Sequence, residues 1–244
     1  MQIFGKIFRV LWNPQYRAAF LRAGVAASTE HDRIISNLDL DNVVDIGANR
    51  GQFALCVRRH YPRAQIFSFE PLQKPAATYQ VVFKGDARAK LFNKAIAAVS
   101  GSAAMHVSRW DVSSSLLPIA QAQHDNFPFT EEARMETVPL TTLSACIDRS
   151  ALAGVSMLKL DVQGFELTAL EGCADLLEAF EYVYVEASFV ELYVGQAMAS
   201  EVVSYLLNRG FSLMCVANLE TGNSQRPIQA DFLFSRKPAS NQRT

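Results

Sequence analysis

One segment limits the fold more than any other: residues 42–53, which read Asn-Val-Val-Asp-Ile-Gly-Ala-Asn-Arg-Gly-Gln-Phe. Its apolar start predicts a buried strand, and its glycines predict a tight loop that opens a helix. A second apolar run, 65–69, predicts another strand, and Glu70 follows it directly. Such a strand, loop, helix and strand with an acidic residue at the second tip is typical of nucleoside binding, because the carboxylate can accept hydrogen bonds from both ribose hydroxyls.

The loop itself argues against a dinucleotide. Gly47 and Gly51 are spaced Gly-x-x-x-Gly, whereas a pyrophosphate is usually brought onto a helix N-terminus by Gly-x-Gly-x-x-Gly. Asp45 would also meet a phosphate with like charge. A cofactor without phosphates fits this loop, and S-adenosylmethionine (SAM) combines a ribose and an adenine with an amino-acid tail and a cationic sulfonium.

The bulk composition describes one large domain. The chain has 244 residues, half of them apolar, which is enough for a substantial core. Lys and Arg total 23 against 24 for Asp and Glu, so no net field attracts nucleic acid, and we expect no nucleic-acid partner. The four cysteines are scattered without a Cys-x-x-Cys pair. They are predicted to be reduced core residues of a cytoplasmic protein, neither disulfide partners nor zinc ligands.

The two ends of the chain carry weaker signals. No apolar run reaches the roughly 18 residues of a membrane span. Residues 1–12 are apolar but contain Lys6 and Arg9 and lack a small-residue cleavage site, so a secretory signal is not expected. Residues 1–40 are predicted to form a helical extension, with an N-terminal helix that packs on the domain or covers its cleft. Contact with a membrane surface or with another subunit, as in a homodimer, stays open. Residues 238–244 are predicted to be disordered.

Short apolar runs alternate with helical patterns, which predicts an α/β domain over 41–237 with a mostly parallel sheet. Apolar residues between 167 and 180, and again near 199–209, recur at helical spacing. No helix separates the last two strands, so they should pair antiparallel. Seven strands ending in an antiparallel hairpin make up the Rossmann-like class I methyltransferase fold. The strands are expected at 42–48, 65–70, 90–96, 156–162, 182–188, 211–216 and 231–236.

The pattern breaks down between residues 101 and 140. Residues 102–108 predict an extra strand, and the polar stretch 109–134 predicts an irregular insert. An insert of this length in a compact domain is usually a lid or a binding loop.

The chain resembles the FkbM family of SAM-dependent methyltransferases, bacterial enzymes that mostly methylate hydroxyl groups on sugars and other natural-product or glycan scaffolds. The resemblance implies SAM as cofactor and methyl transfer to a hydroxyl of a saccharide, glycan or natural-product acceptor. Gln163 departs from the family, which more often has glutamate there, so a role that needs an anion at this position is in doubt. The matching segments are 45–51 (Asp-Ile-Gly-Ala-Asn-Arg-Gly), 69–71 (Phe-Glu-Pro), 93–96 (Asn-Lys-Ala-Ile), 113–116 (Ser-Ser-Ser-Leu), 158–166 (Leu-Lys-Leu-Asp-Val-Gln-Gly-Phe-Glu) and 185–186 (Val-Glu).

The cofactor contacts follow from the loop and the strand tips. Glu70 is expected to bind the ribose diol, and Asp45 to orient the methionine amine directly or through water. Gly47 and Gly51 would let the backbone approach the amino-acid portion. Asn49 would contact the cofactor carboxylate or only stabilise its loop. The full predicted set is Asp45, Gly47, Ala48, Asn49, Gly51, Glu70, Pro71, Asn93, Ala95, Ser114 and Asp161, with a turn-forming Asn93 and a flexible serine loop at 113–115 as the plain alternatives.

Methyl transfer to oxygen needs a group that takes the hydroxyl proton. Asp161 lies at the tip of the fourth expected strand, the edge where open α/β sheets bind ligands, and it forms the leading pair with Glu166. Glu186 at the fifth tip and His124 in the insert are further candidates; Glu166 has the alternative of a first-turn helix residue. The other histidines, His31, His60 and His106, are expected to be structural. A divalent metal on Asp161 and Glu186 has no distinctive ligand spacing behind it, so no metal is predicted.

Two other functions compete with methyl transfer. An NAD-dependent oxidoreductase would share the fold, but the missing Gly-x-Gly-x-x-Gly counts against it. A catalytically silent methyltransferase-fold scaffold in a glycan-assembly complex would need no acidic residues at the strand tips, yet positions 45, 70, 161 and 166 are all acidic.

Overall fold

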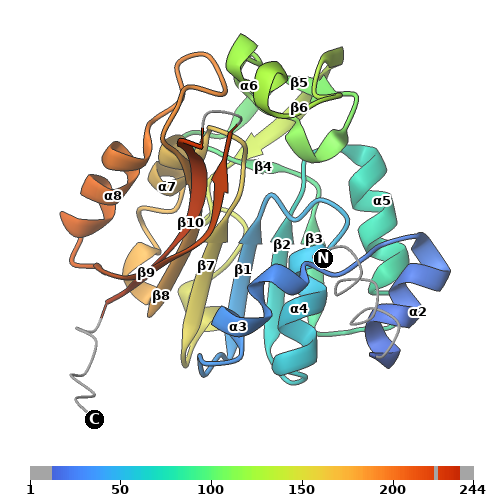
Figure 1. Cartoon of the computed structure of the whole chain (residues 1–244). Coiled ribbons are helices and arrows are strands. Elements are labelled where there is room, and N and C mark those ends of the chain that lie inside the picture. The colour runs from blue at the N-terminus through green and yellow to red at the C-terminus, as the bar shows by residue number, and fades with distance from the viewer. Residues whose placement is uncertain (1–12, 223–224, 237–244) are drawn as a thin grey trace.

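A seven-stranded sheet runs through the centre of the computed structural model, which describes residues 13–222 and 225–236. Its strand order is β3-β2-β1-β7-β8-β10-β9 (Figure 1). The first five are parallel, while β10 runs antiparallel to β8 and β9. This confirms the predicted sheet and its terminal hairpin. The strands are β1 (Asn42–Ile46), β2 (Gln65–Phe69), β3 (Ala89–Phe92), β7 (Ser156–Leu160), β8 (Tyr182–Ser188), β9 (Ser212–Thr221) and β10 (Pro227–Ser235).

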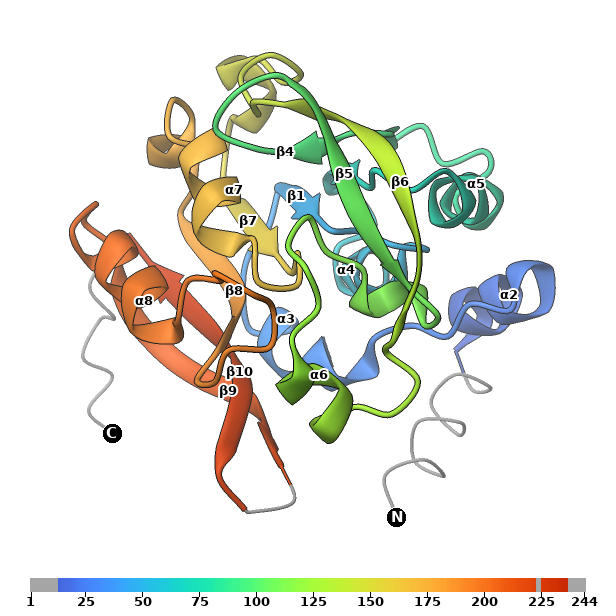
Figure 2. The same ribbon diagram turned by 90° about the horizontal axis from the view of Figure 1, so that it is seen from above.

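Helices cover both faces of the sheet (Figures 1 and 2). Val44 and Val185 pack in one core cluster with α7 and α8. Val43 and Tyr184 pack in the opposite cluster with α2, α3, α4 and α5. Neighbouring residues of β1 thus serve opposite faces, as the two-residue repeat of a strand requires. The helices are α2 (Pro14–Ala23), α3 (Asp32–Ile35), α4 (Gln52–His60), α5 (Gln73–Val82), α7 (Glu166–Gly172) and α8 (Ala199–Leu207), with short 3-10 turns η1 (Thr29–His31), η3 (Arg149–Leu152) and η4 (Leu177–Ala179).

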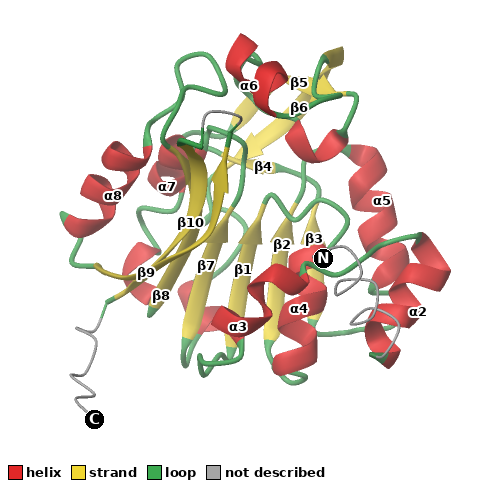
Figure 3. Cartoon of the chain, viewed as in Figure 1, coloured by secondary structure: helices red, strands yellow, loops and turns green. Residues whose placement is uncertain are grey.

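A second sheet lies above the carboxyl ends of the parallel strands (Figure 1). It has the order β4-β6-β5, formed by β4 (Ala95–Ile96), β5 (Gly101–Ser108) and β6 (Glu132–Thr141). β5 was expected; β6 was not, because most of its residues are exposed and show no apolar alternation. The expected irregular insert also contains η2 (Asp111–Ser113) and α6 (Gln121–Asn126). Figure 3 shows long loops between these elements.

The single strand expected at 90–96 is wrong, because the chain leaves the main sheet at Asn93. The Asn93 side-chain amide donates to the carbonyl oxygens of Glu70 at 2.7 Å and Pro71 at 3.0 Å. Residues before it pair with β2, and the two residues of β4 pair with β6 instead.

The helix expected between 167 and 180 is also shorter than its pattern. α7 ends at Gly172, and the chain continues through turns to η4. Gly172 packs directly on the segment after β4: a Cβ there would lie 2.3 Å from the carbonyl oxygen of Ala97. α8 agrees with the helix expected near 199–209.

The N-terminal segment packs on the domain, although its first part, residues 1–12, lies outside the described residues, as does the tail 238–244. The Asn13 side chain accepts from the backbone N–H groups of Gln15 and Tyr16 and starts α2, and Gly24 in the left-handed conformation ends it. In the ranges 13–222 and 225–236, no helix combines the length and apolar character that crossing a bilayer requires.

The close approach at Gly172 generates a stability prediction. Gly172→Ala should lower the free energy of unfolding by about 1–3 kcal/mol, because the added methyl group overpacks against backbone that cannot move freely. Gly101→Ala is the matched control, since a Cβ there meets nothing within 4 Å, and it should change stability by no more than about 0.5 kcal/mol. Urea unfolding of both variants measures the difference; equal stabilities would contradict the packing described.

Candidate active site

A cavity of about 550 Å³ opens at the carboxyl ends of β1, β2 and β7, a size typical of small-molecule sites, which span about 300–1,000 Å³. The glycine loop after β1 and the tip of β7 form part of its wall. The segments 24–31 and 110–116 complete it. Of the predicted cofactor residues, the cavity is lined by Gly47, Ala48, Asn49, Glu70, Pro71, Ala95, Ser114 and Asp161.

At Gly47 the loop after β1 packs directly against the backbone of Asp161. The φ of Gly47 is +79°, and a Cβ would lie 1.8 Å from the carbonyl oxygen of Asp161, so no larger residue fits. Gly51 has a different role from the predicted one. It does not line the cavity, and its missing side chain makes room for the rings of Tyr79 and Phe83, whose nearest atoms would lie 2.9 and 2.6 Å from a Cβ.

Glu70 is held by its own loop. One carboxylate oxygen accepts from the backbone N–H of Leu72 at 2.7 Å and the other from that of Asn49 at 2.9 Å. A carboxylate offers about four lone-pair sites, so both oxygens can accept further hydrogen bonds from a ligand. Burial raises the pKa of Glu70 to about 7, although the two backbone donors act in the opposite direction.

Asp45 does not line the cavity, contrary to its predicted contact with the cofactor amine. Its side chain is fully buried, and the Lys159 ammonium pairs with it at 3.2 Å. Among the described residues, no backbone N–H donates to the Asp45 carboxylate. Burial raises the pKa of Asp45, while the Lys159 charge opposes that rise. Lys159 also donates to the Gly47 carbonyl at 3.3 Å, so Asp45 acts behind the loop.

Asn93 is likewise absent from the cavity lining, because its amide is used to bend the chain after β3. Ala95 and Ile96 come from β4 and line the cavity together with Leu72, Met105 and Leu116, so one part of the wall is apolar. Ser114 lines the cavity too, and its hydroxyl accepts from the backbone N–H of Ser108 at 3.1 Å.

Asp161 is the most exposed carboxylate of the predicted catalytic set, with 39% of its side chain accessible. The Gln163 amide donates to Asp161 at 2.8 Å and to Glu186 at 3.1 Å, while its oxygen accepts from the Tyr193 hydroxyl at 2.7 Å. Glu186 does not line the cavity. Burial and the charge of Asp161 raise the pKa of Glu186 well above its usual value. Gln163 thus bridges two acidic groups that would otherwise repel each other.

The other two predicted catalytic residues lie away from the cavity. Glu166 is buried, and one of its oxygens accepts from the backbone N–H groups of Val162 at 3.0 Å and Gly164 at 3.1 Å. It therefore shapes the turn before α7, and burial raises its pKa to about 7. His124 lies on α6, with its ring 3.5 Å from the Thr130 hydroxyl, and it does not line the cavity.

The structure brings in residues that the sequence did not single out. His31 lines the cavity instead of being purely structural. Its Nδ1 lies 2.9 Å from the Tyr184 hydroxyl, which in turn donates to Asp231 at 2.8 Å. Burial lowers the pKa of His31 against the opposing charge of Asp231. No local motif marks this residue, because its partners come from β8 and β10.

A second feature that the sequence did not single out is an ion pair in the cavity wall. Arg50 in the glycine loop pairs with Asp111 at 2.5 Å, which ties the segment 110–116 to the loop after β1. Trp110 next to it lines the cavity and is 57% exposed. The insert therefore supplies a wall of the cavity, in line with its expected role as a binding loop.

Comparison with known proteins identifies the family. A sequence model of the methyltransferase FkbM domain matches residues 45–213. The chain belongs to the FkbM methyltransferase family. It is accordingly a SAM-dependent methyltransferase, and the oxidoreductase alternative is set aside.

Two similar proteins accompany this match. The 2-O-methyltransferase NoeI of Sinorhizobium fredii is 27% identical over 201 residues, covering 76% of this chain and 80% of that protein. The methyltransferase domain of a bacterial Hen1 protein, CtHen1-C, has a TM-score of 0.50 at 11% identity, covering 85% of this chain and 95% of that one. The second similarity shows a shared class I methyltransferase fold.

The Glu70 environment predicts a pH dependence for cofactor binding. If the ionised carboxylate accepts the ribose hydroxyls, affinity for S-adenosylhomocysteine should rise as pH increases through about 7, where Glu70 loses its proton. Glu70→Gln should weaken binding roughly 10- to 100-fold above that pH, since hydrogen bonds to charged groups contribute about 1.5–3 kcal/mol, and should remove much of the pH dependence.

Isothermal titration across pH 6 to 8 measures both effects. Glu178→Gln, at an exposed glutamate on η4, is the matched control, and it should bind like the unmodified protein. Thermal unfolding of the Glu70→Gln variant checks that the loop is still folded. The check is needed because the NH₂ group of the new amide would face one of the two backbone N–H donors that Glu70 accepts from. A folded Glu70→Gln variant with unchanged affinity and pH dependence would remove Glu70 from the site.

Proposed function

We propose that the protein transfers a methyl group from SAM to a hydroxyl oxygen of a saccharide or a similarly hydroxylated small molecule. The observation that carries this proposal is the exposed carboxylate of Asp161 at the edge of the cavity, two residues from an amide that fixes it. The similarity to a 2-O-methyltransferase supports oxygen as the acceptor atom.

The described residues fit the cofactor. The remaining lone pairs of Glu70 can accept the ribose hydroxyls, and the apolar wall of Leu72 and Ile96 can take the adenine. The bare backbone of Gly47 allows the amino-acid portion to pass close to β1. When bound, SAM supplies a methyl group activated by its sulfonium.

The acceptor would enter from the open side of the cavity. Trp110 offers a partly exposed ring there, on which the apolar face of a sugar can pack. The chain has almost no net charge, which fits a neutral acceptor better than a polyanion.

Transfer to oxygen is an in-line displacement: a carbon–oxygen bond forms as the carbon–sulfur bond breaks, and the hydroxyl proton must be accepted. Asp161 is the proposed acceptor of that proton, because its partly exposed carboxylate lines the cavity directly after β7. Gln163 holds it from one side, and the Lys159 ammonium lies 3.7 Å away on the other. His31 also lines the cavity, and burial lowers the pKa of its imidazole; it is the alternative proton acceptor.

The same geometry predicts which variants lower the rate of methyl transfer without changing cofactor affinity. Asp161→Ala should keep the affinity for S-adenosylhomocysteine within about threefold and lower the rate of methyl transfer by about 10²–10⁴, the usual contribution of general acid–base catalysis. Asp39→Ala, at an exposed carboxylate before β1, should change neither. A larger loss in His31→Gln than in Asp161→Ala would move the proton acceptor to His31.

The acceptor is found by mass spectrometry of glycan and sugar-nucleotide extracts incubated with the enzyme and labelled SAM. A gain of one methyl group on a hydroxyl supports the proposal. Methylation of a nitrogen or of nucleic acid would overturn it. A protein that binds S-adenosylhomocysteine but methylates nothing in these extracts would favour the silent scaffold instead.

A further inference from the structure

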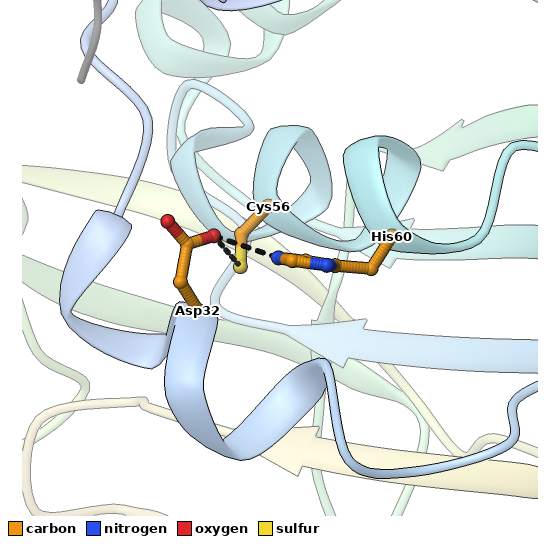
Figure 4. Close-up of side chains that lie close together, drawn as sticks. All are labelled: Asp32, Cys56 and His60. Atoms are coloured by element: carbon orange, nitrogen blue, oxygen red, sulfur yellow. Dashed lines mark hydrogen bonds and ion pairs between the residues drawn. The ribbon is translucent and has the colours of Figure 1, made fainter.

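Three side chains that the cofactor cavity does not use meet behind its wall. Asp32 begins α3, and Cys56 and His60 lie on α4. His60 Nε2 lies 2.9 Å and Cys56 Sγ 3.4 Å from the same oxygen, Asp32 Oδ1, and the three ligand-type atoms all lie within 4.8 Å of one another. Figure 4 shows the three side chains pointing toward a common point between the two helices.

The arrangement has the features of a site for a zinc-type cation. Cys56 and His60 are four residues apart on one helix, the spacing that places two ligands on one helix face. Atoms of a tetrahedral zinc site with nitrogen, oxygen and sulfur ligands lie roughly 3.3–3.6 Å apart, given bonds of about 2.0–2.3 Å. The two separations from Asp32 Oδ1, 2.9 and 3.4 Å, are within about 0.5 Å of these values, so small rotations of the side chains are sufficient.

The surroundings of Asp32 support a ligand role as well. Arg59 Nη1 pairs with Asp32 Oδ2 at 3.0 Å, which orients the carboxylate and leaves Oδ1 toward the cluster, as outer-shell partners of metal sites do. The Tyr16 hydroxyl also approaches Oδ1, at 3.2 Å. Three donors therefore point to one oxygen that offers about two lone pairs, so hydrogen bonding alone leaves Oδ1 overcrowded.

The charges of the three side chains also match a divalent cation. The Asp32 carboxylate and a Cys56 thiolate together neutralise a divalent ion, with His60 as the neutral nitrogen ligand. Zinc binds a cysteine as its thiolate, so binding would release the proton of the Cys56 thiol.

We propose that Asp32, Cys56 and His60 bind a zinc-type divalent cation, with the fourth position open to water. Sulfur, nitrogen and oxygen ligands together favour zinc over magnesium or calcium, which prefer oxygen alone. In the described part of the chain, this is the single group of three such ligands that lie so close together.

The site would fasten the N-terminal segment to α4. Asp32 directly follows His31, and residues 24–31 contribute a wall of the cofactor cavity, whereas none of the three ligands lines that cavity. The cation is thus a structural clamp on the wall of the site and takes no part in methyl transfer, so this inference does not depend on the acceptor.

Cobalt(II) and zinc(II) test the proposal on the full chain after metal removal under reducing conditions. Cobalt should give a near-ultraviolet sulfur-to-metal charge-transfer band and the visible bands of a tetrahedral ion, and added zinc should abolish them. Zinc should raise the midpoint temperature of unfolding, since a ligand that binds only the folded state stabilises it.

Cys56→Ser and His60→Gln should each weaken zinc binding about 100-fold or more, because loss of an outer-shell partner alone costs about 10–100-fold. Cys146→Ser and His106→Gln, at the same residue types elsewhere, should bind as the unmodified protein does. S-adenosylhomocysteine binding confirms that each variant is folded. A cobalt spectrum without the charge-transfer band in the unmodified protein, or zinc binding insensitive to Cys56 and His60, would overturn the site and leave a hydrogen-bonded junction.

Discussion

The candidate active site depends on one buried ammonium group. Lys159 and Asp45 are direct register neighbours on β7 and β1, and both side chains are almost completely inaccessible. Removing one partner of such a pair costs about 3–5 kcal/mol, because the other charge stays buried without compensation. Lys159 also contacts the Gly47 carbonyl and lies 3.7 Å from Asp161. One side chain thus joins the strand core, the glycine loop and the acidic tip of β7.

This pairing explains how the cavity combines acidic residues with a tight backbone. Gly47 can touch the carbonyl of Asp161 because the two strand ends are held together behind it. Further along the same edge, Gln163 separates Asp161 from Glu186 with a neutral amide. A glutamate at position 163 would place a third carboxylate there and would lack the amide N–H groups. Glutamine therefore suits this site, because its amide donates to both Asp161 and Glu186.

The sequence predicted those parts of the site that depend on local signals. Glu70 follows a short apolar run and Asp161 another, and parallel strands bring both tips to one edge. Asp45 carries an equally clear local signal, yet its side chain is buried against Lys159. No local pattern reveals this pairing, because Lys159 lies far along the chain. His31 joins the cavity through contacts to Tyr184 and Asp231, which no local pattern encodes. β6 was missed for a similar reason: its exposed residues form a strand because β5 and β4 pair with them.

We infer that the sheet edge between Glu70 and Asp161 holds the nucleoside of SAM. A crystal structure with S-adenosylhomocysteine tests it most directly. We expect both ribose hydroxyls within hydrogen-bonding distance of the Glu70 carboxylate, the adenine against Ile96 and Leu72, and the sulfur on the side of Asp161. A nucleoside bound elsewhere, or a ribose that does not contact Glu70, would contradict it.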